Sequence, residues 1–255
     1  MAEACAIDVV VFDVLGTMVN EPGGLRAAVC EAVRAGTSTA AEVEGPGGGV
    51  GSGVNGMNGE PGEAFVDQLV AVWQDHVAQE QRRIDAGERA YANSEVLDRE
   101  AAGLVAERAA LTDPLALARL ATAAQRLDAW ADSSAGLARF ARRFPVLGLT
   151  HASRATLLRL NAHADLRWHQ ALSAEDAAAH KPAPAVYRLA LDAAGCPPER
   201  VLMVAAHAWD LRGAQSVGMR TAHVCRPVGD PPRESDTFTW RANSLTELAD
   251  VLMPS

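Results

Sequence analysis

The sequence predicts an α/β protein: a Rossmann-like, doubly wound parallel sheet that carries an inserted, all-helical cap domain. Three observations support this fold class. An apolar, β-branched run over residues 7–12 ends abruptly at Asp13, as expected of a strand that is buried on both faces. Residues 64–127 repeat apolar side chains at three- and four-residue steps, which indicates helices. After residue 130, apolar runs alternate with helical segments, a pattern typical of a parallel sheet with crossover helices.

We expect a core made of residues 1–19 and 131–255 and a cap made of residues 20–130. Within the cap, helices are predicted from residue 64 onward, over 94–109 and over 113–127. Residues 44–63 are rich in glycine and almost lack large apolar side chains, so they predict a flexible loop. A ligand-gripping glycine loop is the less favoured alternative, because no strand precedes it and no Lys-Ser or Lys-Thr pair follows.

The core sequence places polar residues where its strands end. Strands are predicted over 144–150, 201–204 and 221–225, with helices over 154–161, 184–194 and 210–217. Open parallel sheets bind ligands at the carboxyl ends of their strands. The polar residues at those ends are Asp13, Thr150 and the group 207–210, with Lys181 in a loop before a helix.

Composition excludes several classes of partner. The 255 residues carry 23 basic and 32 acidic side chains, a net charge of −9, without a dense basic stripe, so no nucleic-acid partner is expected. No apolar run approaches the roughly 18 residues of a membrane span, and the start lacks a basic signal region, so we expect a cytoplasmic protein without a membrane partner. The scattered cysteines predict reduced thiols and no metal site; they are Cys5, Cys30, Cys196 and Cys225.

Four short segments resemble the motifs of the haloacid dehalogenase superfamily, in the family's order along the chain. They are residues 12–17 (FDVLGT), 149–150 (LT), 180–187 (HKPAPAVY) and 205–210 (AAHAWD). The third and fourth are most similar to the branch of type II, L-2-haloacid dehalogenases. The resemblance covers most of the chain, outside the glycine-rich segment, and implies the same core and helical cap.

The resemblance implies a catalytic set of Asp13, Thr17, Lys181 and Asp210. Asp13 would be the nucleophile and form a covalent ester, and the Lys181 ammonium would keep it ionised. Thr17 and Thr150 offer hydroxyls, and backbone N–H groups after Asp13 form a nest for a substrate carboxylate. Asp210 would either hold Lys181 or orient the water that cleaves the ester.

Position 15 argues against a Mg²⁺-dependent phosphatase, the commonest kind of enzyme in this superfamily. Phosphatases of the family place a general acid two residues after the nucleophile, where this chain has Leu15. The fourth motif also supplies one carboxylate, Asp210, although Mg²⁺ prefers several hard oxygen ligands. A halide leaves without a proton, so a dehalogenase needs no such acid. We therefore expect no metal and no organic cofactor.

The predicted substrate pocket departs from the dehalogenase pattern at several positions. Leu15 stands where the family has tyrosine, and His151 and His207 stand where it has asparagine. Gln74 falls where a cap arginine cradles the halide. The residues we expect to bind substrate are Leu15, Gln74, Thr150, His151, Tyr187, His207 and Trp209.

Several of these positions allow two interpretations. His151 is either a cation that grips an anion or a neutral histidine bonded to the backbone, and the neutral form is favoured for His207. Arg83 and Arg89 of the cap are more often solvated arginines than replacements for the missing one. Trp209 either walls the site or packs in the core, and Tyr187 either bonds near the carboxylates or is a phenol without function.

The sequence thus predicts a hydrolase that cleaves the carbon–halogen bond of a small 2-haloalkanoic acid through an ester on Asp13. Two alternatives stay open. One is a phosphatase, or another hydrolase of a small anionic metabolite. The other is a catalytically silent binding protein, suggested by the altered Gln74 and His151 positions. A homodimer is possible through an apolar cap face.

Overall fold

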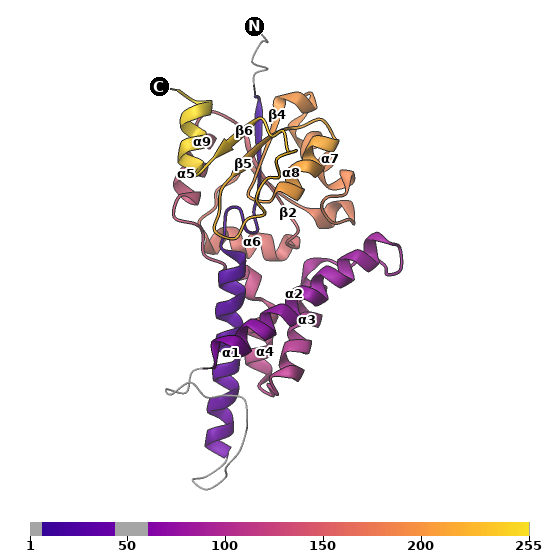
Figure 1. The fold of residues 1–255 in the computed structure, drawn as a ribbon, viewed down its shortest axis with the longest axis vertical. Helices are drawn as coiled ribbons and strands as arrows, with labels where there is room; N and C mark the ends of the chain where they lie inside the picture. Colours follow the sequence, from indigo (N-terminus) through magenta and orange to yellow (C-terminus); the bar gives the residue numbers. More distant parts are fainter. Residues whose placement is uncertain (1–6, 44–60, 255) are drawn as a thin grey trace. The chain divides into compact units, whose positions relative to one another are not determined.

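A computed structural model describes residues 7–43 and 61–254 (Figure 1). Residues 44–60 of the glycine-rich segment, for which a flexible loop was predicted, lie outside the described residues. None of the helices formed by the described part of the chain is both long and apolar enough to cross a lipid bilayer.

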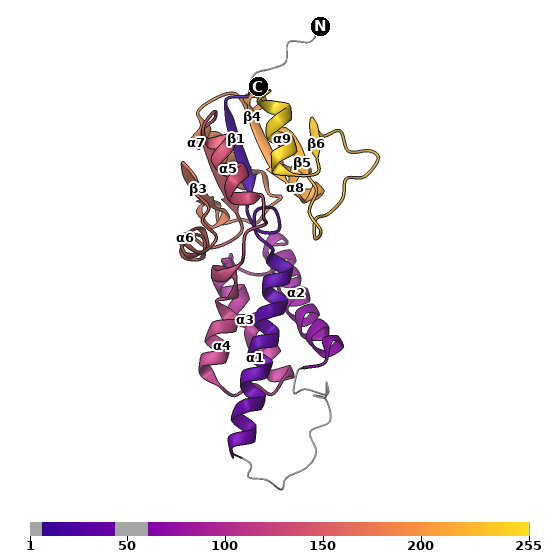
Figure 2. The same ribbon diagram turned by 90° about the vertical axis from the view of Figure 1, so that its left-hand side faces the viewer.

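A six-stranded sheet forms the centre of the core, in the order β3-β2-β1-β4-β5-β6, and every pair of neighbouring strands is parallel (Figures 1 and 2). This confirms the predicted α/β class. The strands are β1 (Val9–Asp13), β2 (Val146–Thr150), β3 (Gln170–Ser173), β4 (Val201–Ala205), β5 (Arg220–Val224) and β6 (Trp240–Ala242).

The strand side chains alternate between the two faces of this sheet, and helices cover both faces. Val11 of β1 belongs to a buried cluster with Val186 and Leu211, which come from the helices α7 and α8. Its neighbour Phe12 points the other way, and its ring lies 5.3 Å from that of Phe140 on α5. The core helices are α5 (Ser133–Ala141), α6 (Arg154–His163), α7 (Pro184–Ala194), α8 (Ala208–Ser216) and α9 (Leu245–Leu252).

Four core elements were not predicted from the sequence: β3, β6, α5 and α9. The two strands have four and three residues, too short for a clear alternation of apolar and polar positions. The helices α6, α7 and α8 lie where helices were predicted.

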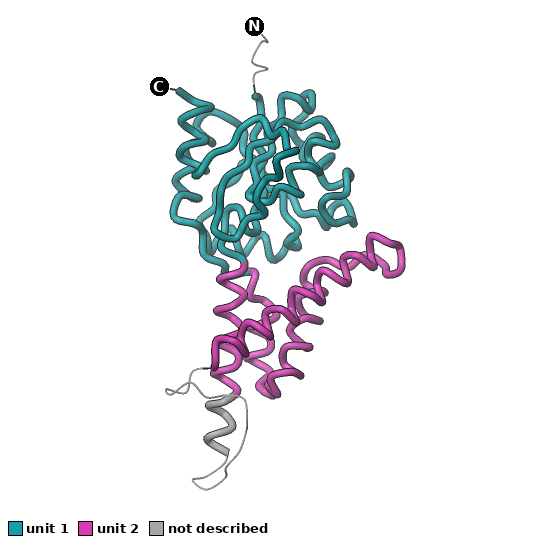
Figure 3. Tube along the Cα trace, in the orientation of Figure 1, with its two compact units in different colours: residues 1–21, 125–255 teal, residues 22–124 magenta. Residues whose placement is uncertain are grey.

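The chain divides into two compact units, residues 1–21 with 125–255 and residues 22–124 (Figure 3). The second unit contains α2 (Glu63–Asp85), α3 (Ser94–Arg108) and α4 (Pro114–Ala121), together with α1 (Glu21–Val43) from its second residue onward. The domain boundaries predicted from the sequence, after residues 19 and 130, stay a prediction.

The second unit has an apolar core of its own. Val29, Leu69, Val105 and Leu120, one from each of the four helices, are buried together. The side chains of Asn93 and Asp113 accept backbone N–H bonds at the first turns of α3 and α4, which stabilises those helix starts. The predicted helix over 113–127 was too long, because α4 ends at Ala121 and a 3₁₀ turn follows over Ala123–Arg126.

Candidate active site

Asp13 lies at the carboxyl end of β1, a central strand of the sheet, and is buried. Its two carboxylate oxygens have different partners. Oδ2 accepts a hydrogen bond of 2.6 Å from the Thr17 hydroxyl. Oδ1 accepts a bond of 2.9 Å from the Lys181 ammonium. The neighbouring β2 and β4 end beside it, so side chains that follow those strands converge here.

Lys181 joins Asp13 to Asp210. Its Nζ lies 2.9 Å from Oδ1 of Asp13 and 2.8 Å from Oδ2 of Asp210. Lys181 is in the loop before α7, as predicted, and Asp210 is in the first turn of α8. The three side chains are almost wholly buried, so their attraction is screened little by solvent.

The three charges alter one another's ionisation. Burial raises the pKa of Asp13, but the charges of Lys181 and His207 and the bond from Thr17 outweigh it, and the pKa lies below the ordinary value. Burial also raises the pKa of Asp210, and there Lys181 does not outweigh it. Burial lowers the pKa of Lys181, but the two carboxylates together raise it above the usual value. Asp13 is therefore the more readily ionised carboxyl group.

Both oxygens of Asp210 are occupied. The Tyr187 hydroxyl donates to Oδ1 over 2.6 Å, and Lys181 donates to Oδ2. Burial raises the pKa of Tyr187, so the phenol stays protonated as a donor. Of the two roles considered for Asp210, this geometry favours holding Lys181 over orienting a water molecule. Tyr187 bonds to the buried carboxylate, in line with the first of its two interpretations.

Thr17 connects the loop after β1 to the end of β4. Its hydroxyl donates to Asp13 and accepts a bond of 2.9 Å from the N–H of Ala206. Within the same loop, Gly16 has φ +78° and lies against the ring of His207. His207, half-buried, stacks on Trp209 with ring centroids 5.8 Å apart.

His151 is neutral in this structure. Its Nε2 accepts a bond of 2.6 Å from the backbone N–H of Lys181. Burial and the charge of Lys181 lower its pKa to about 3. Of the two interpretations offered for His151, the geometry therefore favours the neutral, backbone-bonded one. Its ring stacks on the half-buried Trp209, 6.1 Å away, so both His151 and His207 stack on this tryptophan.

The other predicted binding residues are less closely tied to Asp13. Thr150 is fully buried at the end of β2, and its hydroxyl accepts the N–H of Ala152 over 3.2 Å. Leu15 is half-buried two residues after Asp13, where its backbone pairs with Val19. Gln74 is exposed on α2 and belongs to the other unit.

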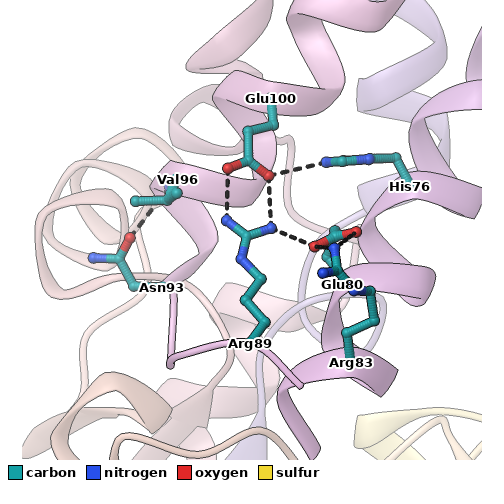
Figure 4. A network of polar contacts seen from close by, with 7 residues as sticks. All are labelled: His76, Glu80, Arg83, Arg89, Asn93, Val96 and Glu100. Carbon is teal, nitrogen blue, oxygen red and sulfur yellow. Dashed lines mark hydrogen bonds and ion pairs between the residues drawn. The ribbon is translucent and has the colours of Figure 1, made fainter. Parts of the chain in front are cut away.

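The two cap arginines considered as replacement cations are engaged in ion pairs within their own unit (Figure 4). Arg89 donates to Glu80 over 2.5 Å and to both oxygens of Glu100, and Arg83 donates to Glu80 over 3.0 Å. His76 lies 3.1 Å from Glu100. This network ties α2 to α3, which favours a structural role for both arginines.

Two residues near Asp13 were not singled out from the sequence. Glu21, half-buried at the start of α1, has its pKa raised to about 7 by burial and the charge of Asp13. Arg226, whose side chain is largely covered, follows β5, and its Nε donates to the carbonyl of Thr17 over 2.8 Å. Neither lies in a recognisable motif; Glu21 directly follows this loop in the sequence, whereas only the folded chain brings Arg226 to it.

Among residues 7–43 and 61–254, no three His, Cys, Asp or Glu side chains are grouped so as to hold a metal ion. The carboxylates of Asp13 and Asp210 instead share the Lys181 ammonium group. Catalysis without a metal or cofactor stays a prediction that needs an assay.

Comparison with known proteins points to one family. A family model described as haloacid dehalogenase-like hydrolase matches residues 7–218. (S)-2-haloacid dehalogenase 4A of Burkholderia cepacia is 38% identical over 81 residues, 32% of this chain and 35% of that protein. An (S)-2-haloacid dehalogenase of Pseudomonas fluorescens is 29% identical over 140 residues, 54% of this chain and 62% of that protein. The chain thus spans less than two thirds of the length of these curated relatives.

Solved structures match over a longer range. The crystal structure of the L-2-haloacid dehalogenase PA0810 superposes with a TM-score of 0.76, covering 98% of this chain and 100% of that one at 24% identity. At this identity the likeness shows the fold. The family model covers most of the chain, including all four predicted motifs. The protein therefore belongs to the haloacid dehalogenase-like hydrolases.

Proposed function

We propose that the protein hydrolyses the carbon–halogen bond of a small 2-haloalkanoic acid through an ester on Asp13. The observation that carries this proposal is the Lys181 ammonium, 2.9 Å from Asp13 and 2.8 Å from Asp210. It favours an ionised Asp13, and an ionised carboxylate is the form that attacks carbon.

In the first step a carboxylate oxygen of Asp13 attacks C2 of the substrate. A bond forms between that oxygen and C2 while the bond between C2 and the halogen breaks, and halide leaves with the electron pair. The halide takes no proton, so the apolar Leu15 at the position of the phosphatase acid is no obstacle. A single displacement inverts the configuration at C2.

In the second step water attacks the carbonyl carbon of the Asp13 ester. The bond from that carbon to the ester oxygen breaks, and the product leaves as a 2-hydroxy acid. One proton of the water goes to the product hydroxyl and the other is released. The oxygen from water stays on Asp13, which becomes a carboxylate again.

The surrounding residues support these steps in different ways. Thr17 and Lys181 bond to opposite oxygens of Asp13 and would orient the carboxylate for attack. Asp210, held by Tyr187, would keep Lys181 in place. We assign substrate contacts to the half-buried Leu15, His151, His207 and Trp209 at the loop and strand ends.

The comparisons support the substrate class that we propose. The relatives found by sequence are (S)-2-haloacid dehalogenases, and one solved structure of this fold is that of an L-2-haloacid dehalogenase from Xanthobacter autotrophicus with chloropropionic acid covalently bound. We therefore propose 2-haloalkanoic acids of the L series as substrates. Gln74 is our candidate cap contact, and binding by the cap stays part of the proposal.

The test is halide release from L-2-chloropropionate and from haloacetates without added Mg²⁺, with Asp13→Asn as the catalytic variant. We expect release by the wild type and a loss of at least about a thousandfold in Asp13→Asn, since the nucleophile is removed. Asp8→Asn is the matched control, because Asp8 precedes the same strand and pairs with Arg200 over 2.6 Å. This control should retain its halide release.

A single turnover in H₂¹⁸O should place the label on the Asp13 carboxylate, detected by mass spectrometry of its peptide. Mg²⁺-dependent hydrolysis of p-nitrophenyl phosphate, without halide release, would replace the proposal by the phosphatase alternative. If neither reaction occurs and no ester on Asp13 is trapped, the result would favour the catalytically silent binding protein over both hydrolases.

A further inference from the structure

Three consecutive backbone carbonyls in the loop after β1 are each held by a side chain from a distant part of the core. Trp130 donates from Nε1 to the carbonyl of Gly16 over 3.1 Å. Arg226 donates from Nε to that of Thr17 over 2.8 Å. Ser133 donates from its hydroxyl to that of Met18 over 2.7 Å. This is the loop whose Thr17 hydroxyl bonds to Asp13.

Arg226 is the charged member of this set and is itself held in place. Its side chain is 6% exposed, and its Nη1 lies 2.8 Å from a carboxylate oxygen of Asp132. Its guanidinium lies over the ring of Trp130, 5.9 Å from the centroid. The other oxygen of Asp132 accepts the N–H of Leu245, which anchors the pair to the start of α9.

Stability alone is a weak reason for an arginine at this position. Burying an ion pair costs desolvation energy that the attraction often fails to offset, and an apolar side chain of similar volume is often at least as stabilising. One nitrogen of Arg226, Nη2, is buried without a hydrogen-bond partner in the described structure, which adds to that cost. The distinctive contribution of Arg226 is therefore the fixed position that it gives to Thr17.

We propose that Arg226 is a positioning residue, which fixes the backbone of Thr17 and through the Thr17 hydroxyl aligns the Asp13 carboxylate for attack. The chain of contacts is short. Arg226 holds the Thr17 carbonyl at 2.8 Å, and the Thr17 hydroxyl bonds to Oδ2 of Asp13 at 2.6 Å. Arg226 bonds to the Thr17 carbonyl, whereas the Asp13 carboxylate is bonded by Thr17 and Lys181, so we assign the effect of Arg226 to Thr17.

The segment that carries Arg226 also fixes the helix that carries Asp210. The backbone carbonyl of Asp230 accepts the N–H of Ala208, and its carboxylate accepts the N–H of Trp209 over 3.2 Å, both in the first turn of α8. A Cβ on Gly229 would lie 2.6 Å from the carbonyl of Ala206, so this segment passes close to the end of β4. One segment after β5 thus positions two of the catalytic elements.

The test is a double-mutant cycle of Arg226→Met and Thr17→Val. This inference rests on the proposed function only for the rate measurement. If Arg226 acts through Thr17, each single variant should lower kcat for halide release about tenfold or more, with KM changed much less. The double variant should then be no slower than the slower single variant, because the two changes remove the same effect. Independent, multiplying losses would overturn the proposal.

A second measurement does not depend on the substrate. The ¹³C signal of the Asp13 carboxyl group, assigned by comparison with Asp13→Asn, gives the pKa of this residue directly. Arg226→Met should raise this pKa by about half a unit or more, in the direction of Thr17→Val, since the bond that favours the carboxylate is loosened. An unchanged pKa in Arg226→Met would contradict the inference even if the protein proves not to be a dehalogenase.

Two further variants separate positioning from folding. Arg226→Lys keeps the positive charge but lacks the guanidinium fork that reaches Thr17 and Asp132 together. Its kcat should therefore lie between those of the wild type and Arg226→Met. It replaces Arg226→Met in these measurements if that variant fails to fold. Arg200→Gln breaks an ion pair with Asp8 that lies before β1. This control should change neither kcat nor the pKa of Asp13, and a change as large as that in Arg226→Met would overturn the assignment.

Discussion

Gly16 shows how closely single residues are fitted around Asp13. Its φ of +78° lies in the left-handed region that residues with a Cβ rarely adopt. A Cβ at this position would also lie 2.4 Å from Nε2 of His207. Both the backbone conformation and the close contact with His207 therefore require glycine at position 16. This residue belongs to the loop that contains Thr17.

We predict that Gly16→Ala lowers both stability and activity. The backbone strain should cost about 1–2 kcal/mol of unfolding free energy, and displacement of His207 or of the loop should lower kcat by about tenfold or more. Urea denaturation and halide release measure the two effects.

Gly87 offers a matched control for this change. Its φ is +74°, and nothing lies within 4 Å of a Cβ built on it. Gly87→Ala should therefore lose a similar amount of stability from strain but keep full kcat. Equal kcat in Gly16→Ala and wild type would show that the contact with His207 does not matter for the reaction.

At the scale of elements, the crossing of α7 and α8 brings Tyr187 to Asp210. The crossing needs Gly213 in the middle of α8, where a Cβ would lie 2.3 Å from the Tyr187 hydroxyl. Glycine inside a helix is unfavourable by about 0.5–1 kcal/mol relative to alanine. Glycine is nevertheless needed at position 213, because the Tyr187 hydroxyl passes over it to reach the Asp210 carboxylate.

We predict opposite signs for two Gly→Ala changes inside helices. Gly213→Ala should destabilise the protein and lower kcat, because the new methyl group displaces Tyr187 from Asp210. Gly103→Ala in α3 should raise the unfolding free energy by about 0.5–1 kcal/mol without any change in kcat, since Gly103 has open space around it. Thermal denaturation compares the two. A stabilised Gly213→Ala variant would show that the contact between α7 and α8 leaves space for a Cβ at position 213.

Elements with a strong local pattern were predicted from the sequence, and short or irregular ones were not. The β1 run VVVF and the helix α7, which begins at Pro184 and ends at Ala194 before Gly195, carry clear signals of their own. α1 was missed because its first turn contains Pro22, Gly23 and Gly24, residues that usually mark turns; Pro22 is tolerated in a first turn.

The cluster of polar residues around Asp13 was predictable because each member follows a strand or opens a helix in a recognisable motif. Asp13, Thr17, Lys181, Tyr187 and Asp210 lie in the motif segments, and the structure brings them together. Glu21 and Arg226 could not be found in this way, because the burial of Glu21 and the contact of Arg226 with Thr17 arise only in the folded chain. The ionisation of His151 likewise depends on burial and on Lys181, which no local pattern encodes.

At the scale of the whole molecule, two groups near the site link folding to pH in opposite directions. The pKa of His151 falls from 6.5 to about 3 on folding, so its contribution to stability is present above pH 6.5 and is lost as the pH falls towards 3. The pKa of Glu21 rises from 4.5 to about 7. Its contribution is present below pH 4.5 and is lost as the pH rises through 7.

We predict that His151→Gln flattens the acid side of the stability profile. Glutamine still offers an oxygen to the N–H of Lys181 but does not take up a proton in this range. Between pH 6.5 and pH 4, the unfolding free energy of the variant should therefore fall less steeply than that of the wild type. Urea denaturation at several pH values measures both slopes, and parallel slopes would contradict a neutral His151.

The order of the strands also has a consequence for how the chain is made. β1 is synthesised first, yet its partners β2 and β4 begin only at Val146 and Val201. The ribosome therefore releases an apolar strand with two unpaired edges long before either neighbour exists. Such distant pairing slows folding and exposes the strand to association with other chains. We expect the nascent protein to depend on chaperones until β4 has emerged.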